Sequence, residues 1–214
     1  AKTLVDKNVK LTAIVNNAGR GLAHEGTHGE EIMNVNVMGA KRVVDAFSPL
    51  LHPSGDGYAR IVNVGSGAGP SYVGKLDDET KQVYCNPAVT LEQFEALYKE
   101  GNSKNQVQLD YGAEYGLSKA LLSTYTLYLA RTMGEKNILS FSLSPGYIDT
   151  NITKGFPGGK PPSEGTMSIR HCLFNAGPEC NGWFFGSDAK RSPLHAPRDP
   201  GTPEFDGVCP WDEK

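Results

Sequence analysis

The sequence contains few cysteines, little excess charge of either sign and no long apolar run. Its four cysteines form no C-x-x-C pair and are too few for a disulfide scaffold in a chain of 214 residues. Lys and Arg total 21 against 24 Asp and Glu, and the net charge of −3 argues against a nucleic-acid or anionic-membrane surface as the main function. No stretch approaches the roughly 18 apolar residues that a membrane span needs. These absences predict a soluble protein with free thiols.

Hydrophobic residues make up 38% of the sequence, which excludes a disordered chain and is enough for a core. Glycine is abundant, at 25 residues, but follows no collagen-like period, so we expect glycines at turns and close backbone approaches. Residues 1–10 show neither a secretory nor a transit pattern. We therefore expect a protein of the cytoplasm or of an organelle lumen.

Short apolar runs alternate along the chain with segments in which apolar residues recur at helical spacing. The predicted elements, in chain order, are a strand at 11–15, a helix at 30–50, a strand at 59–64, a helix at 112–133, a strand at 138–143, a helix at 161–175 and a short strand at 183–185. Strands that alternate with helices of this length predict an α/β fold with a doubly wound parallel sheet and helices on both faces.

Two segments depart from this alternation. Residues 71–110 are more polar and form a predicted insertion, in which a Thr90-x-x-Gln93 capping box predicts one short helix. The stretch 187–214 is rich in proline and has no periodicity. We therefore predict one domain at residues 1–186, followed by an irregular tail.

Polar or glycine-rich turns follow three of the predicted strands. The turns are Asn16-Asn17-Ala18-Gly19, Gly65-Ser66-Gly67 and Pro145-Gly146. Because ligands of doubly wound sheets bind at the carboxyl ends of the strands, we expect these turns to converge on one site.

Tyr115 and Lys119 are four residues apart on a predicted helix and therefore lie on one face. A free tyrosine has a pKa of about 10, but an adjacent fixed cation favours the phenolate and lowers that pKa. Ser66 is placed to hold a substrate oxygen, and the buried amide of Asn36 to anchor a water. Such a set fits proton transfer to a carbonyl oxygen while a cofactor delivers hydride. Taken singly, each residue also fits a purely structural role.

Five motifs occur in order, and none is specific alone. They are Asn16-Asn17-Ala18-Gly19, Asn36-Val37-Met38-Gly39, Val62-Asn63-Val64-Gly65-Ser66, Tyr115-Gly116-Leu117-Ser118-Lys119 and Pro145-Gly146-Tyr147-Ile148-Asp149-Thr150. With these motifs the chain resembles the short-chain dehydrogenases/reductases, and within them the carbonyl-reductase and salutaridine-reductase-like branch. The resemblance covers residues 11 to about 185 and implies the C-terminal part of a Rossmann-like fold.

The resemblance implies roles for single residues. Tyr115 would donate or accept the proton, Lys119 would adjust the pKa of Tyr115 and contact the nicotinamide ribose, Ser66 would orient the carbonyl, and Asn36 would hold a proton-relay water. Asn17, Ala18 and Gly19 would lie beside the adenosine ribose, and Pro145, Gly146, Ile148 and Thr150 would face the nicotinamide. The implied activity is NAD(P)H-dependent reduction of an aldehyde or ketone, a small-molecule carbonyl substrate, with hydride from the nicotinamide and a proton from Tyr115. NADP(H) is expected ahead of NAD(H).

The start of the chain departs from the family. The family begins with a strand, a T-G-x-x-x-G-x-G turn, a helix and a second strand that reads the ribose 2′ position, whereas ten residues precede Leu11 here. We therefore expect at least two β-α units, on the order of 60 residues, to be absent, together with the pyrophosphate site. An open sheet edge at residues 11–15 would need a missing segment or another chain to cover it. The 214-residue chain is expected to be inactive alone.

Several alternatives stay open. The chain could be a non-catalytic structural subunit of a larger assembly, derived from a reductase, or a proteolytic or incompletely sequenced fragment of an active reductase. Tyr115 follows Ser66 by 49 positions, which resembles the branch insertion that covers the family's usual dimer face and implies a monomer. The segment His24-Glu25-Gly26-Thr27-His28 matches the H-E-x-x-H zinc pattern, but its glycines oppose the helix that zinc binding needs. We predict a loop there and no metal.

Overall fold

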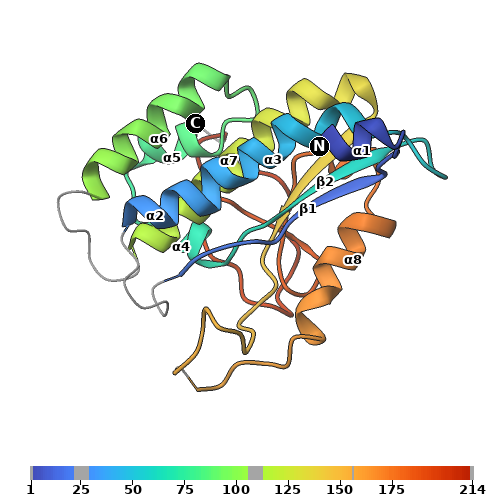
Figure 1. The fold of residues 1–214 in the computed structure, drawn as a ribbon. Coiled ribbons are helices and arrows are strands. Elements are labelled where there is room, and N and C mark those ends of the chain that lie inside the picture. The colour runs from blue at the N-terminus through green and yellow to red at the C-terminus, as the bar shows by residue number, and fades with distance from the viewer. Residues whose placement is uncertain (1, 22–28, 106–112, 156, 213–214) are drawn as a thin grey trace.

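A sheet of five strands lies at the centre of the structure (Figure 1). The computed structural model describes residues 2–21, 29–105, 113–155 and 157–212. The strands, in their order across the sheet, are β1 (Ala13–Asn16), β2 (Ala59–Val64), β3 (Ile138–Leu143), β4 (Phe184–Phe185) and β5 (Arg191–Ser192). The first four pair in parallel and β5 is antiparallel to β4. The predicted α/β class with a parallel sheet is confirmed.

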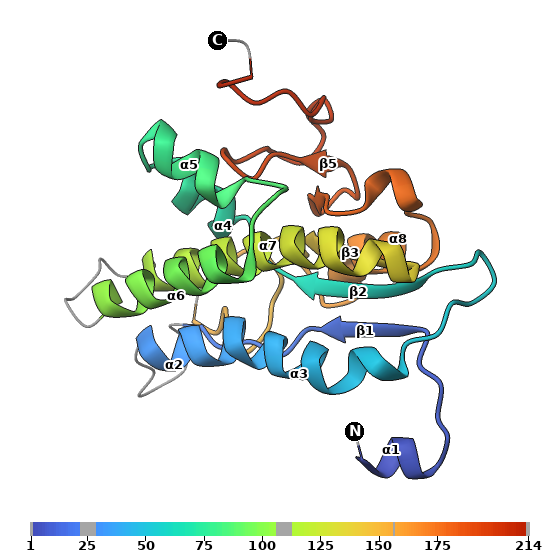
Figure 2. The ribbon, with the colours of Figure 1, turned by 90° about the horizontal axis from the view of Figure 1, so that it is seen from above.

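Helices cover both faces of this sheet. They are α1 (Lys2–Asp6), α2 (Gly29–Met33), α3 (Ala40–Phe47), α4 (Ala68–Val73), α5 (Asp78–Tyr84), α6 (Leu91–Asn105), α7 (Ala113–Met133) and α8 (Met167–Phe174). Short 3₁₀ turns add Ser48–Leu50, Gly134–Lys136, Glu164–Thr166 and Pro178–Cys180. α3 contacts β1 and α7 contacts β3 on one face, whereas α8 contacts β2 and β3 on the other (Figures 1 and 2).

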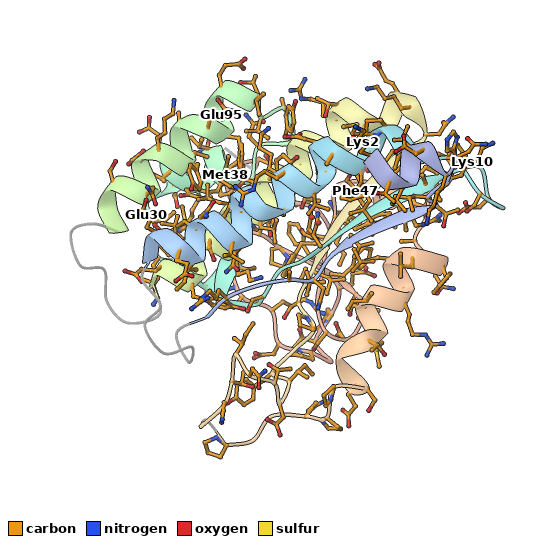
Figure 3. All side chains as sticks on the ribbon, in the orientation of Figure 1. Lys2, Lys10, Glu30, Met38, Phe47 and Glu95 are labelled. Carbon is orange, nitrogen blue, oxygen red and sulfur yellow. The ribbon has the colours of Figure 1, made fainter. Side chains whose placement is uncertain are left out.

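The core is divided between the two faces. Ile61 and Val62 are neighbours in β2, and their side chains point to opposite faces of the sheet. Both are 0% exposed, because helices cover both faces. Ile61 belongs to the apolar cluster under α3 and α7, and Val62 to the cluster under α8. Phe47, labelled in Figure 3, packs against the first cluster from the end of α3.

The first strand lies at an edge of the described sheet. β1 pairs with β2 and with no other strand of the described residues, with Asn16 in register with Asn63. β1 and β5 therefore form opposite edges, and α1 lies beyond β1 (Figure 2). The edge position expected for residues 11–15 is thus observed, and what would cover the edge stays a prediction.

The helix predicted at residues 30–50 contains a wider turn. α2 is followed by a π-helix at Asn34–Gly39, and α3 continues from its end. π-helical segments within α-helices are rare and are found disproportionately at functional sites. Asn36, one of the predicted site residues, lies within this turn.

The predicted insertion contains more helix than its sequence pattern indicated. The capping box is confirmed, since the Thr90 N–H donates to Gln93 Oε1 (2.9 Å) and the Gln93 N–H donates to Thr90 Oγ1 (3.2 Å). α4 and α5 precede it and were not predicted, because each spans at most two turns. Asp77 caps α5 by accepting the Thr80 N–H (2.9 Å).

The tail predicted to be irregular contributes one short strand. β5 pairs with β4 through Phe184 and Ser192 and through Phe185 and Arg191. A two-residue strand carries too little alternation to be seen in a sequence. Within the described residues, no helix has the length and apolarity needed to cross a membrane.

Candidate active site

The residues of the Y-x-x-x-K motif lie on one face of α7. Lys119 Nζ is 5.5 Å from the centre of the Tyr115 ring, and it donates a hydrogen bond to the Val64 carbonyl oxygen at the end of β2 (2.9 Å). Lys119 is only 4% exposed. α7 is apolar on most of its circumference and packs against α4, α6 and β3, so a lysine on it is drawn into the protein.

Burial controls the electrostatics of this pair. Loss of hydration lowers the pKa of Lys119 from 10.5 to about 8. Burial raises the pKa of Tyr115, and the hydrogen bond between Tyr115 and Ser66 opposes that rise. Our expectation that the Lys119 cation lowers the pKa of Tyr115 therefore misses the larger effect. The buried phenol keeps its proton at neutral pH.

Asn36 joins three parts of the chain. Its Oδ1 accepts the Arg20 N–H (2.7 Å), and its Nδ2 donates to the Arg20 carbonyl oxygen and to Ser118 Oγ (3.0 Å each). Asn36 is 2% exposed. Both N–H groups of the amide are thus used within the protein, which fixes the loop after β1 against α7. Sequence reasoning missed Ser118, although it lies inside the Y-x-x-S-K motif.

A second buried network holds the strand ends in register. Asn16 Nδ2 donates to Asn63 Oδ1 (2.8 Å), and Asn63 Nδ2 donates to Thr126 Oγ1 on α7 (2.9 Å). Ser144, directly after β3, accepts the backbone N–H groups of Gly67 (3.1 Å) and Gly146 (3.2 Å). Asn16 and Asn63 lie in apolar strands, Thr126 lies on α7 and Ser144 lies in a turn. In the sequence, only the position of the two asparagines and Ser144 at strand ends indicated a function.

The converging strand ends line a cavity of 560 Å³, which we call the cofactor cavity. Its walls include all nine residues predicted to bind a cofactor, namely Asn17, Ala18, Gly19, Tyr115, Lys119, Pro145, Gly146, Ile148 and Thr150. Ser66 also lines it, whereas Asn36 lies behind its wall. A Cβ on Gly19 would stand 3.3 Å from Asn36 Oδ1 and 3.6 Å from Lys119 Nζ, so the turn after β1 has little room for a side chain.

A neighbouring cavity of 580 Å³ shares Ser66, Pro145 and Gly146 with the cofactor cavity, and we call it the substrate cavity. The tail supplies part of its wall, from Ser187 to Pro200. Sequence reasoning gave the tail no role, because a proline-rich segment carries no pattern that places it in space.

The described residues contain no group of three or more His, Cys, Asp or Glu that could hold a metal ion. The H-E-x-x-H segment at residues 24–28 lies outside the described residues.

Comparisons with known proteins find relatives among named reductases and dehydrogenases. The family model described as "Enoyl-(Acyl carrier protein) reductase" matches residues 102–173. The (+)-neomenthol dehydrogenase of Arabidopsis thaliana is 29% identical over 174 residues, which cover 67% of this chain and 57% of that protein. Salutaridine reductase of Papaver bracteatum is 30% identical over 165 residues, covering 73% and 51%. The chain spans about half the length of the curated relatives it matches.

Solved structures share the fold. Salutaridine reductase from Papaver somniferum superposes with a TM-score of 0.67 at 23% identity, over 82% of this chain and 72% of that one. NADPH-bound carbonyl reductase from chicken fatty liver gives a TM-score of 0.60 at 20% identity, over 89% and 68%. The ordered motifs, the parallel sheet and these relatives point the same way, and the chain belongs to the short-chain dehydrogenase/reductase family.

Proposed function

We propose that the native protein carrying this chain reduces an aldehyde or ketone with NADPH in preference to NADH. One observation carries the proposal: Tyr115, Lys119 and Ser66 meet in a cavity whose walls include every residue predicted to contact the cofactor. The relatives named as reductases and dehydrogenases support the same reaction class, and one similar structure is described as NADPH-bound.

The cofactor cavity suits the nicotinamide end of such a cofactor. Lys119 Nζ and the Thr150 side chain offer polar groups for a ribose and a carboxamide, and Ile148 and Pro145 offer apolar surface for a flat ring. When bound, the nicotinamide would supply the hydride for the carbonyl carbon. The polar groups of Lys119 and Thr150 and the apolar side chains of Ile148 and Pro145 line the same cavity, so the residues present fit this group.

Tyr115 supplies the proton in this proposal. Burial keeps its phenol protonated at neutral pH, and the Ser66 hydroxyl is hydrogen-bonded to it. Ser66 also lines the substrate cavity, so both hydroxyls are placed to reach one carbonyl oxygen. Lys119, charged below a pKa of about 8, stabilises the phenolate that remains after proton transfer.

Asn36 positions other groups of the site. Its amide holds the backbone of Arg20 and the hydroxyl of Ser118, which fixes the loop after β1 beside Lys119. A proton-relay water at Asn36 remains part of the proposal. Since both amide N–H groups are already used, that water would have to be held by an oxygen of Asn36.

A direct assay tests this function. The native protein is mixed with NADPH or NADH and a panel of aldehydes and ketones, and cofactor consumption is followed by absorbance. We expect consumption that depends on the carbonyl compound and is faster with NADPH. Binding of NADPH without any carbonyl-dependent consumption would instead favour the non-catalytic structural role.

A further inference from the structure

A third cavity, of 490 Å³, lies apart from the Y-x-x-x-K residues, and we call it the tail cavity. It is lined by the tail from Arg191 to Asp212, by the C-terminal part of α7 and by residues at the end of α5. Phe184 and Ser192, which pair across β4 and β5, line both the tail cavity and the substrate cavity. The β4–β5 hairpin is therefore their common wall.

Several aromatic rings form part of the wall of the tail cavity. Both tryptophans of the sequence, Trp183 and Trp211, line it together with Phe205. His195 meets the rings of Phe205 and Trp211 edge-on, at centroid distances of 5.6 and 5.4 Å. Burial lowers the pKa of His195, which keeps this ring uncharged at neutral pH. An apolar ligand would find flat, uncharged surfaces here.

The guanidinium group of Arg191 faces this cavity. The Arg191 guanidinium stacks 4.2 Å from the Trp183 ring centre and 5.3 Å from that of Phe205. Its backbone N–H donates to Glu204 Oε1 (2.7 Å), but its guanidinium donates to none of the residues that the structure describes. Stacked guanidinium groups with free N–H edges are well suited to a carboxylate.

The charge balance of the walls favours an anion. Arg131 is a second cation of the cavity, tied by one hydrogen bond to the Val89 carbonyl oxygen (3.0 Å). Asp212 is the one acidic residue among the described walls, and its carboxylate accepts the Cys209 N–H (2.8 Å). Two arginines against one aspartate leave a net positive wall.

We propose that the tail cavity is a second ligand site, which binds a bulky apolar carboxylate. The carboxylate would pair with Arg191 and the apolar body would lie against Trp183, Trp211 and Phe205. This site goes beyond the proposed reductase activity and does not depend on it, since none of its walls includes Tyr115, Lys119 or Ser66.

Tryptophan fluorescence tests the proposal, because both tryptophans lie in this cavity. The native protein is titrated with adamantane carboxylate, which is optically silent, and in parallel with the uncharged adamantane carboxamide. We expect the carboxylate to exclude water from the indole rings and shift their emission to shorter wavelength, with an affinity about tenfold or more above that of the carboxamide. An equal response to both compounds, or to neither, would overturn the proposal.

Two variants locate the anion contact. Arg191→Met and Arg131→Gln should each weaken binding of the carboxylate, Arg191→Met by about tenfold or more, whereas the exposed Arg170→Met on α8 should bind normally. Circular dichroism checks that each variant is folded. If Arg191→Met does not fold, the proposal is tested by two other results: whether the native protein prefers the carboxylate over the carboxamide, and whether Arg131→Gln weakens binding of the carboxylate. Unchanged affinity in both cavity variants would contradict the site.

Discussion

Lys119 shows what a buried functional side chain costs the fold. Its ammonium is held almost entirely out of water by α7 and the end of β2, and its pKa falls from 10.5 to about 8. The unfolded chain therefore binds this proton more tightly than the folded one. The penalty is fully present below pH 8 and disappears as the pH rises from about 8 through 10.5.

Lys119→Met should reveal this penalty. We expect the free energy of unfolding of the variant, relative to the unmodified protein, to fall by up to about 3 kcal/mol between pH 8 and pH 10.5. Urea unfolding at several pH values measures it. Lys136→Met, at an exposed position just after α7, is the control and should show no such trend. A difference that does not change with pH would show that Lys119 is well hydrated.

Asn36→Ala tests the buried amide. The change removes three hydrogen bonds that join Arg20, the π-helix and Ser118, so we expect the free energy of unfolding to fall by about 2 to 4 kcal/mol. NADPH should also bind more weakly, because the loop after β1 loses its anchor. Asn34→Ala, exposed in the same π-helix, should change both quantities little. Equal effects at the two positions would mean that the network is not specific.

At the scale of the element, local signals in the sequence were the most reliable. The Thr90 and Gln93 capping box formed as predicted, because it depends only on residues three apart. The π-helix around Asn36 was not predictable, since a helix with one wider turn has nearly the same spacing of apolar residues as a regular α-helix. The short strand β5 was missed for a related reason, as its pairing with β4 is set by the fold and not by its own two residues.

Thr90→Ala should shorten or fray α6. Loss of the cap leaves the Gln93 N–H without its acceptor, and we expect the free energy of unfolding to fall by about 1 kcal/mol. Chemical denaturation measures the change. Glu95→Ala, also on α6 (Figure 3), lies outside the capping box and should have a smaller effect. A Thr90→Ala protein as stable as the original would show that tertiary packing alone sets the start of α6.

At the scale of the whole molecule, the sequence predicted which residues meet but not what surrounds them. The three strand-end turns and the Y-x-x-x-K helix converge as expected, because parallel strands place their carboxyl ends together. Residues 187–212 supply half of the residues that line the tail cavity and part of the wall of the substrate cavity, and their position depends on long-range contacts. Such contacts cannot be predicted from the periodicity of the sequence.

An ion pair joins two parts of the tail beside the substrate cavity. Asp188 bonds to Arg198 and accepts the Gly201 N–H (3.0 Å), and the Asp188 and Arg198 side chains are only 19% and 7% exposed. Asp188→Asn should therefore loosen the tail, lower the free energy of unfolding by about 2 kcal/mol and raise KM for the carbonyl substrate more than it lowers kcat. Limited proteolysis of the tail and steady-state kinetics measure these effects. Asp206→Asn, at an exposed position of the same tail, should leave them unchanged.

Tyr115→Phe is the most direct test of the chemistry that the fold arranges. The variant keeps the ring and loses only the hydroxyl, so NADPH should bind with nearly unchanged affinity while kcat falls about a hundredfold or more. Tyr128→Phe, on the same helix but outside the cofactor cavity, is the matched control and should retain its kcat. Carbonyl reduction by the Tyr115→Phe protein at the rate of the Tyr128→Phe protein would contradict the assignment of Tyr115 as the proton donor.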